Sequence, residues 1–234
     1  MVNSAVTHEA RPVRSALAGQ TEALRLAVRA LGEPELALPT RLGTWRVREL
    51  TAHLDRQIGW APEHLDDPLP AGVGELTLTA WVGVVGTVAD ALDRGTREHT
   101  AAHYAGSAEQ AAARFDEVCG VLAAFLASPA SADADRPFPL AFGVMRLADF
   151  LVTRLVETVV HADDLAHALG LDAFPHDARA VAIVAELLLD AVAPAAAGPA
   201  REAAQADPLR WIRLATGRES VTGTGLAEHL PVLS

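Results

Sequence analysis

The stretch MRLADFLVTRLVETVVHADDLAHALG, residues 145–170, is the longest strongly apolar segment of this chain with a helical pattern. It predicts one long helix that ends at Gly170, because glycine is favoured just after the last helical turn. Within it, Glu157 and His161 are four residues apart. Side chains at that spacing lie one turn apart on the same face of a helix. A carboxylate and an imidazole so placed can bind one metal ion.

Further helices are predicted on both sides of this segment by apolar residues that recur every three or four positions. Their ranges are 8–31, 43–60, 77–94, 107–127, 177–192 and 207–218, separated by loops over 63–75 and 128–143 and by a hinge over 194–200 that is rich in Pro and Ala. Several long helices with short or moderate links are typical of an antiparallel bundle. Metal sites in such bundles are built from side chains on facing helices.

The composition favours a globular, mainly α chain and excludes some partners. Half of the 234 residues are hydrophobic, whereas only 5% are aromatic. The net charge of −11, without a basic cluster, argues against a nucleic-acid partner. No apolar run approaches the roughly 20 residues that span a bilayer, and no basic start followed by a hydrophobic run opens the chain. We expect a cytoplasmic monomer or homodimer with no membrane or nucleic-acid partner.

Three residues are candidate metal ligands: His53, inside the helix predicted over 43–60, and the pair Glu157 and His161. Two neutral imidazoles and an ionised carboxylate suit a divalent transition metal and leave a coordination position open for chemistry. Asp164 is placed to accept the second ring N–H of a ligating histidine. Zinc is the default ion, although the same ligands also suit Fe(II), Ni(II) or Mn(II).

A second interpretation of these residues stays open. Arg154, Glu157, His161 and Asp164 could form a solvated helix face with an ion pair, and His53 could be a partly buried histidine without a ligand role. In its favour, such spacings are common on helices. Against it, the residues lie in the most apolar helices, where burying an unpaired charge costs several kcal/mol.

Other chemistries lack the residues that they need. The chain has no P-loop, G-x-S-x-G, C-x-x-C or dinucleotide-binding motif. The single cysteine, Cys119, lies in an apolar run and is interpreted as a small buried hydrophobic residue rather than a nucleophile. The remaining histidines have no convincing ligand spacing: His8, His64, His99, His103, His167, His176 and His229.

Three segments resemble one known family. WRVRELTAHL (45–54), ETVVHADDL (157–165) and WIRLATGR (211–218) are similar to the mycothiol-dependent maleylpyruvate isomerase family of the DinB-like superfamily. The resemblance implies a four-helix DinB-type bundle whose metal, usually zinc, is held at His53, Glu157 and His161. It also implies mycothiol, a low-molecular-weight thiol of actinobacteria, as cosubstrate, and a catalytic role for Arg218.

In that family a smaller α/β domain similar to sterol carrier proteins follows the bundle. Between Ala193 and Asp207 this chain has a Pro and Ala linker where the family has strands. We therefore expect a DinB-like bundle over 1–172 and a reduced sterol-carrier-like α/β domain over 173–234. The shortening leaves two roles open for Arg218, which could reach the metal site or only stabilise the end of a helix.

The resulting functional hypothesis is a metal- and mycothiol-dependent isomerase or S-transferase that acts on a small electrophile. A metal-activated thiolate would add to an electron-poor double bond. Elimination after rotation gives cis–trans isomerisation, whereas release of the adduct gives S-conjugation. Arg218 would bind a substrate carboxylate, and Asp164 would support His161. Two alternatives remain, a metal-dependent hydrolase that uses bound water and a non-catalytic protein that binds small molecules in an apolar cleft.

Overall fold

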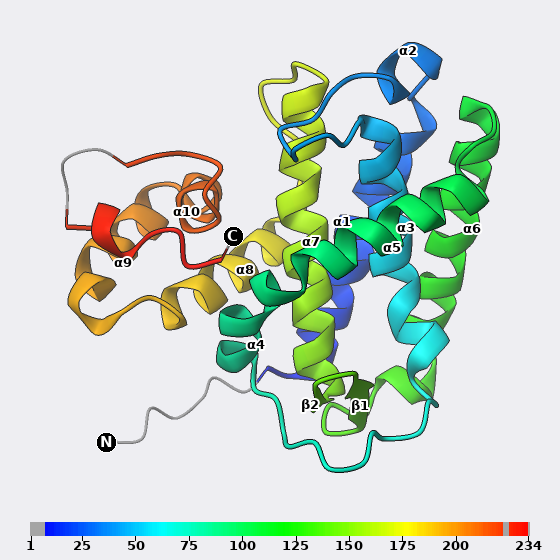
Figure 1. The fold of residues 1–234 in the computed structure, drawn as a ribbon. Helices are drawn as coiled ribbons and strands as arrows, with labels where there is room; N and C mark the ends of the chain where they lie inside the picture. Colours follow the sequence, from blue (N-terminus) through cyan, green and yellow to red (C-terminus); the bar gives the residue numbers. More distant parts are fainter. Residues whose placement is uncertain (1–7, 222–224, 234) are drawn as a thin grey trace.

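Four long helices pack side by side into a bundle in the computed structural model, which describes residues 8–221 and 225–233 (Figure 1). They are α1 (Ala10–Arg29), α3 (Val47–His64), α6 (Ala108–Ala127) and α7 (Leu147–Ala168). Helix α7 packs against α1 and α3, and α6 packs against the same two helices, which closes the ring. The prediction of a mainly α, DinB-like bundle followed by a small C-terminal region is confirmed.

The bundle contains one long crossover, so it is not the simple antiparallel arrangement that the sequence suggested. Figure 1 shows α1 and α7 running in one direction and α3 and α6 in the other. The chain returns from the end of α3 to the start of α6 through α4 (Leu78–Val84), the 3₁₀ turn η1 (Val85–Val88) and α5 (Ala89–His103). We call residues 78–103 the crossover. The helix predicted over 77–94 lies within it but is interrupted by η1.

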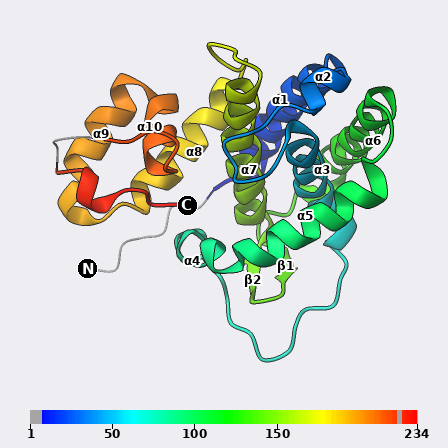
Figure 2. The same ribbon diagram turned by 45° about the horizontal axis from the view of Figure 1, so that its top comes forward.

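The crossover lies against one face of the bundle, as Figures 1 and 2 both show. Helix α5 packs on α3, and α4 packs on α7. Thr96 of α5 is completely buried in the contact with α3. The crossover therefore adds side chains to the outer side of the interface between α3 and α7.

Helix α7 is buried on almost every side, because α1, α3, α4 and α8 all pack around it. Leu151, Leu155 and Val159 are completely inaccessible to solvent. The helix stops where the sequence predicts, since Gly170 has a φ of +65°, a conformation that side chains rarely adopt. In residues 8–221 and 225–233, no helix is long and apolar enough to cross a membrane.

A short hairpin over residues 137–146 precedes α7 and overlaps the segment 128–143 that was predicted to be a loop. After the 3₁₀ turn η2 (Pro129–Ser131), β1 (Pro137–Leu140) pairs antiparallel with β2 (Gly143–Arg146). Phe138 of β1 is fully buried, and its ring stacks on Phe150 of α7 at 3.8 Å. The hairpin thus closes the end of the bundle at which α7 begins (Figure 1).

The C-terminal region is helical, and the predicted α/β fold for it is wrong in the described residues of 173–234, which contain no strand. Its helices are α8 (Ala178–Asp190), α9 (Ala197–Ala206) and α10 (Pro208–Ala215), with 3₁₀ turns η3 (Pro194–Ala196) and η4 (Ala227–His229). The segment predicted as a hinge forms η3 and the start of α9, because alanine is the strongest helix former. Trp211 of α10 is fully buried and donates from Nε1 to the carbonyl of Ala185 in α8 at 3.1 Å.

The remaining short helix, α2 (Glu33–Leu36), lies between α1 and α3. After it, residues 37–46 form the loop that leads into α3. This loop carries Arg41 and Trp45 to the side of the bundle where α7 ends and α10 lies. It therefore contributes to the region in which the predicted site residues meet.

Candidate metal centre

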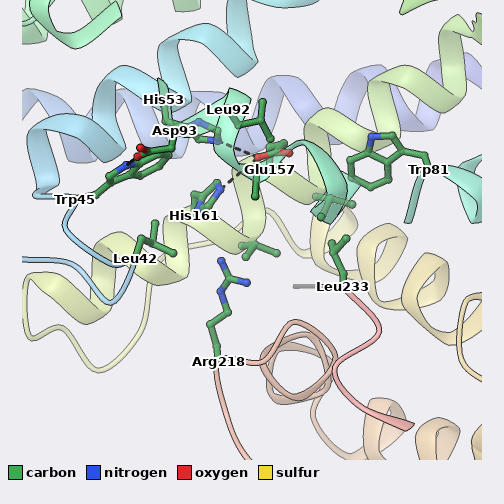
Figure 3. Close-up of a pocket in the computed structure, with 14 residues that line it drawn as sticks. Leu42, Trp45, His53, Trp81, Leu92, Asp93, Glu157, His161, Arg218 and Leu233 are labelled. Atoms are coloured by element: carbon green, nitrogen blue, oxygen red, sulfur yellow. Dashed lines mark hydrogen bonds and ion pairs between the residues drawn. The ribbon is translucent and has the colours of Figure 1, made fainter. Parts of the chain in front are cut away.

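The three predicted ligands meet at the interface of α3 and α7 (Figure 3). His53 Nε2 lies 3.1 Å from Glu157 Oε2, and His161 Nε2 lies 3.3 Å from the same oxygen. One possible ligand atom from each of the three residues lies within 4.8 Å of the others. We call these three residues the His–Glu–His cluster. No other group of three such side chains converges in this way among the described residues.

Each histidine of the cluster has a second partner that orients its ring. His161 Nδ1 lies 2.8 Å from Asp164 Oδ2, so the ring donates its Nδ1–H to that carboxylate. His53 Nδ1 lies 3.2 Å from Thr96 Oγ1 on α5, which can accept in the same way. Both Nε2 atoms then direct a lone pair toward the Glu157 oxygen. Three acceptors that face one another form a donor set suited to a cation.

Proton affinities in the cluster follow from burial and from these contacts. Burial lowers the pKa of His53. Burial also disfavours a charged His161, but its bonds to Asp164 and Glu157 prevail and raise its pKa to about 8. Although burial opposes ionisation of Glu157, its bonds to both histidines hold its pKa well below the usual range.

Burial contradicts the interpretation of these residues as a solvated face. Asp164 is completely inaccessible, and the side chains of His53, Glu157 and His161 are between 4% and 13% exposed. Arg154, one turn before Glu157, is only 6% exposed. Charged groups so deeply placed require compensating partners.

Arg154 is a buried cation that contacts no carboxylate within the described chain. Its guanidinium donates to Gln57 Oε1 on α3 and to Thr153 Oγ1, the latter at 3.0 and 3.1 Å. It also lies over the ring of Phe150 at 4.7 Å. Burial lowers its pKa to about 10. The nearest acidic group along its own helix is Glu157, three residues on. The Arg154 guanidinium therefore adds a positive charge close to the cluster.

Arg218 reaches the centre from the C-terminal region. Its guanidinium lies 3.1 Å from Asp164 Oδ2, the oxygen that also binds His161. It donates as well to the carbonyl of Thr216 at 2.8 Å, near the end of α10. The geometry thus places Arg218 both at the end of α10 and beside the cluster, so it is compatible with each of the two roles considered for this residue. Figure 3 shows its side chain directed toward His161.

Two aspartates on α7 join the bundle to its neighbours. Arg41 contacts both Asp163 and Asp164, and Arg213 of α10 contacts Asp163 at 2.6 Å. Asp164 keeps a pKa far below its usual value despite its burial, because His161 and Arg218 are paired with it. These ion pairs fix the loop after α2 and the C-terminal region around the cluster.

The cluster forms the floor of a cavity of about 300 Å³ (Figure 3). Trp45 and Trp81 lie at opposite ends of it in this view. The indole of Trp45 is 5.1 Å from the ring of His53 and donates from Nε1 to Asp93 at 2.6 Å. Apolar side chains supply most of the remaining wall: Leu42, Leu92, Val156, Val160 and Leu233.

Sequence reasoning missed several residues that position the centre, namely Thr96, Arg41, Asp163 and Arg213. Thr96 and Arg41 lie outside the segments that resemble the family. Asp163 and Arg213 lie inside them, but their roles depend on contacts between segments far apart in the chain. Of the other histidines, His99 donates from Nε2 to the carboxylate of Asp55 at 3.0 Å, in a separate buried network with Tyr104 and Arg114. Cys119 is 4% exposed, as predicted, and burial raises its pKa to about 12.

Comparison with models of protein families gives a match over residues 17–166, to a family described as the mycothiol maleylpyruvate isomerase N-terminal domain. The matched range covers more than half of the chain and includes α3 and almost all of α7, with the whole His–Glu–His cluster. Searches of curated proteins and of solved structures gave no match.

Proposed function

Because the chain belongs to the mycothiol maleylpyruvate isomerase N-terminal domain family, we propose that it is a metal-dependent enzyme in which mycothiol adds to a small electrophilic molecule. The observation that carries the proposal is the convergence of two Nε2 atoms on one carboxylate oxygen at the floor of a cavity. The family description supports the thiol and an isomerase-type reaction. The metal and the addition step are our own inference.

The donor set fits a divalent ion. His53 Nε2, His161 Nε2 and one Glu157 oxygen are close enough to bind the same ion. We propose zinc, since two imidazoles and a carboxylate are common ligands for it. Such an ion would lower the pKa of a thiol bound beside it, so that a thiolate is available at neutral pH.

Residues around the cluster prepare it for that role. Asp164 accepts the Nδ1–H of His161 and so keeps the Nε2 lone pair directed inward. Thr96 does the same for His53. Trp45 shields His53 from water. We propose that Asp164 is a positioning residue rather than one that touches the substrate.

Arg218 is proposed to orient the substrate. Three of the five guanidinium N–H groups are used by Asp164 and by the Thr216 carbonyl in the described contacts. The others can donate to a substrate oxygen on which negative charge develops when sulfur attacks. We also propose that the C-terminal region, residues 173–234, belongs to the active unit because it supplies this side chain.

The proposed reaction begins when the thiolate sulfur forms a bond to one carbon of a double bond. The π electrons move to the neighbouring carbon and its conjugated oxygen, near Arg218. Rotation about the resulting single bond, followed by cleavage of the new C–S bond, returns the thiolate and gives the isomer with no net change in atoms. If the intermediate instead takes a proton from solvent at carbon, the product is an S-conjugate.

Elemental analysis of protein prepared without a polyhistidine tag, beside His161→Ala, tests the proposal. We expect near-stoichiometric metal in the wild type, little in the variant, and turnover of an electrophile only when the thiol is added. Activity without thiol would instead support the hydrolase alternative. Absence of metal from the wild type, even after incubation with zinc, would overturn the proposal and favour a protein that only binds small molecules.

A further inference from the structure

The walls of the cavity above the His–Glu–His cluster are apolar on several sides. Leu42 comes from the loop after α2, Trp81 and Leu92 from the crossover, and Val156 from α7. Leu233 closes the cavity from the C-terminal region. Such a surface stabilises a ligand mainly by removing its apolar area from water.

Few charged groups face the cavity, and all are engaged with protein partners. Among the described lining residues Arg218 is the single guanidinium, and it is paired with Asp164. Asp93 is a carboxylate at the Trp45 end, where it accepts from Trp45 and pairs with Arg97 at 3.0 Å. Glu157 adds a second carboxylate at the floor. Lining carboxylates thus outnumber lining guanidiniums.

The excess of carboxylates over guanidiniums in the lining disfavours ligands with several negative charges. With a divalent ion bound, one of its charges is matched by Glu157 and the other by the thiolate of the cosubstrate. Arg218 can share its remaining N–H groups with one substrate oxygen or carboxylate. A second carboxylate would lie against apolar walls or beside Asp93, where it loses its hydration without gaining a cation.

We infer that the substrate of the activity proposed above is an apolar electrophile that carries at most one carboxylate, of the size of a one- or two-ring molecule, and not a small dicarboxylate. The cavity volume of about 300 Å³ sets the size. The two indoles at its ends suit a flat, conjugated body. That this ligand is a substrate rests on the proposed function.

Calorimetric titration with three probes that share a cinnamoyl core tests it: cinnamamide, cinnamate and 4-carboxycinnamate, which carry zero, one and two negative charges at neutral pH. The protein is used in full length, loaded with zinc and saturated with a low-molecular-weight thiol, so that the second charge of the ion is matched as in the argument above. Chromatography of the mixture after each titration checks that the probe has not reacted. We expect the dianion to bind at least about tenfold more weakly than the better of the other two probes. Equal or tighter binding of the dianion, or no binding of any probe, would overturn the inference.

Two variants locate the binding. Leu92→Arg adds a cation to the wall. This variant should bind the dianion, 4-carboxycinnamate, at least as tightly as it binds cinnamate. Trp81→Ala should lower the affinity for cinnamamide at least about fivefold. Trp60 lies outside the cavity, so Trp60→Ala should leave this affinity unchanged. Circular dichroism checks that each variant is folded. An unchanged probe series in a folded Leu92→Arg variant would show that the probes bind elsewhere and overturn the inference.

The titration separates this inference from the proposed function. If the wild type holds no metal and has no thiol-dependent activity but binds the neutral probe more tightly than the dianion, the proposed function is refuted. The inferred preference of the cavity for ligands with few negative charges is then still supported. If metal and thiol-dependent turnover are found and dicarboxylates are the better substrates, the function stands and the inference fails.

Discussion

The guanidinium of Arg218 lies 3.1 Å from the carboxylate of Asp164, which also binds the ring of His161 at 2.8 Å. One buried carboxylate therefore connects a side chain of the C-terminal region with a proposed metal ligand. Because both contacts use the same oxygen, a displacement of Arg218 would alter the contact of Asp164 with His161, and a displacement of His161 would alter its contact with Arg218.

Replacing Asp164 with Asn keeps the shape of the side chain but removes its charge. We expect the affinity for zinc to fall about 10- to 100-fold, because the ring of His161 loses the acceptor that orients it. Competition with a chromogenic chelator measures this. Asp163→Asn is the matched control, since Asp163 pairs with Arg41 and Arg213 but not with His161. An equal loss in both variants would show that the effect is only structural.

Replacing Arg154 with Met should increase zinc affinity several-fold. The substitution removes a buried positive charge behind the cluster and retains most of the apolar volume, and like charges repel more strongly in a poorly hydrated interior. The same chelator competition applies. Arg114→Met serves as the control, because Arg114 is paired with Asp55 in the separate network. A folded Arg154→Met variant that binds zinc more weakly would contradict the prediction.

His176 should make the protein less stable in acid. Burial lowers its pKa in the folded state to about 4, whereas the unfolded value is near 6.5. The unfolded chain therefore binds more protons between these values, and the free energy of unfolding falls as pH decreases from about 6.5 to about 4, by at most ~3 kcal/mol. Urea unfolding at pH 7 and pH 5 should show a smaller loss for His176→Gln than for the wild type. Identical losses would refute a role for His176.

Cys119 should not react with thiol reagents in the folded protein. It is almost completely buried, and its pKa is raised to about 12 by that burial, so the reactive thiolate is scarce at neutral pH. Ellman's reagent should modify it at least about 100-fold more slowly in buffer than in denaturant. Cys119→Ala should also retain any thiol-dependent activity. Rapid modification of the native protein, with full retention of helical structure, would contradict this account.

Local patterns in the sequence predicted the main helices well because each pattern is decided within one or two turns. Ser107 and Gln110 have the three-residue spacing of a capping box at the start of α6. Ser107 Oγ accepts from the N–H of Gln110 at 3.4 Å, and Gln110 Oε1 accepts from the N–H of Ser107 at 2.9 Å. The pairing of Glu157 with His161 also follows from spacing alone. His53 was a candidate ligand from its place in a separate apolar helix, and the family resemblance implied the same role for it.

Features that depend on contacts between distant segments could not be predicted in this way. Thr96 reaches His53 only because the crossover packs on α3, and Arg41 reaches Asp164 across 123 positions of the chain. The hairpin was missed because its strands, four residues each, are too short for a clear alternation. The C-terminal prediction followed the family, whereas the local alanine content determined the structure.

The crossover supplies part of the cavity wall without supplying any of the proposed metal ligands. The proposed metal ligands lie on α3 and α7, whereas Trp81, Leu92 and Asp93 line the cavity from a segment outside the four bundle helices. The proposed metal ligands and part of the cavity wall that would contact the proposed electrophile are therefore encoded in separate stretches of sequence. Under the proposed function, substitutions at Trp81, Leu92 or Asp93 would change this wall without touching the proposed ligands or Thr96, which contacts His53. These three positions are the natural targets for directed evolution.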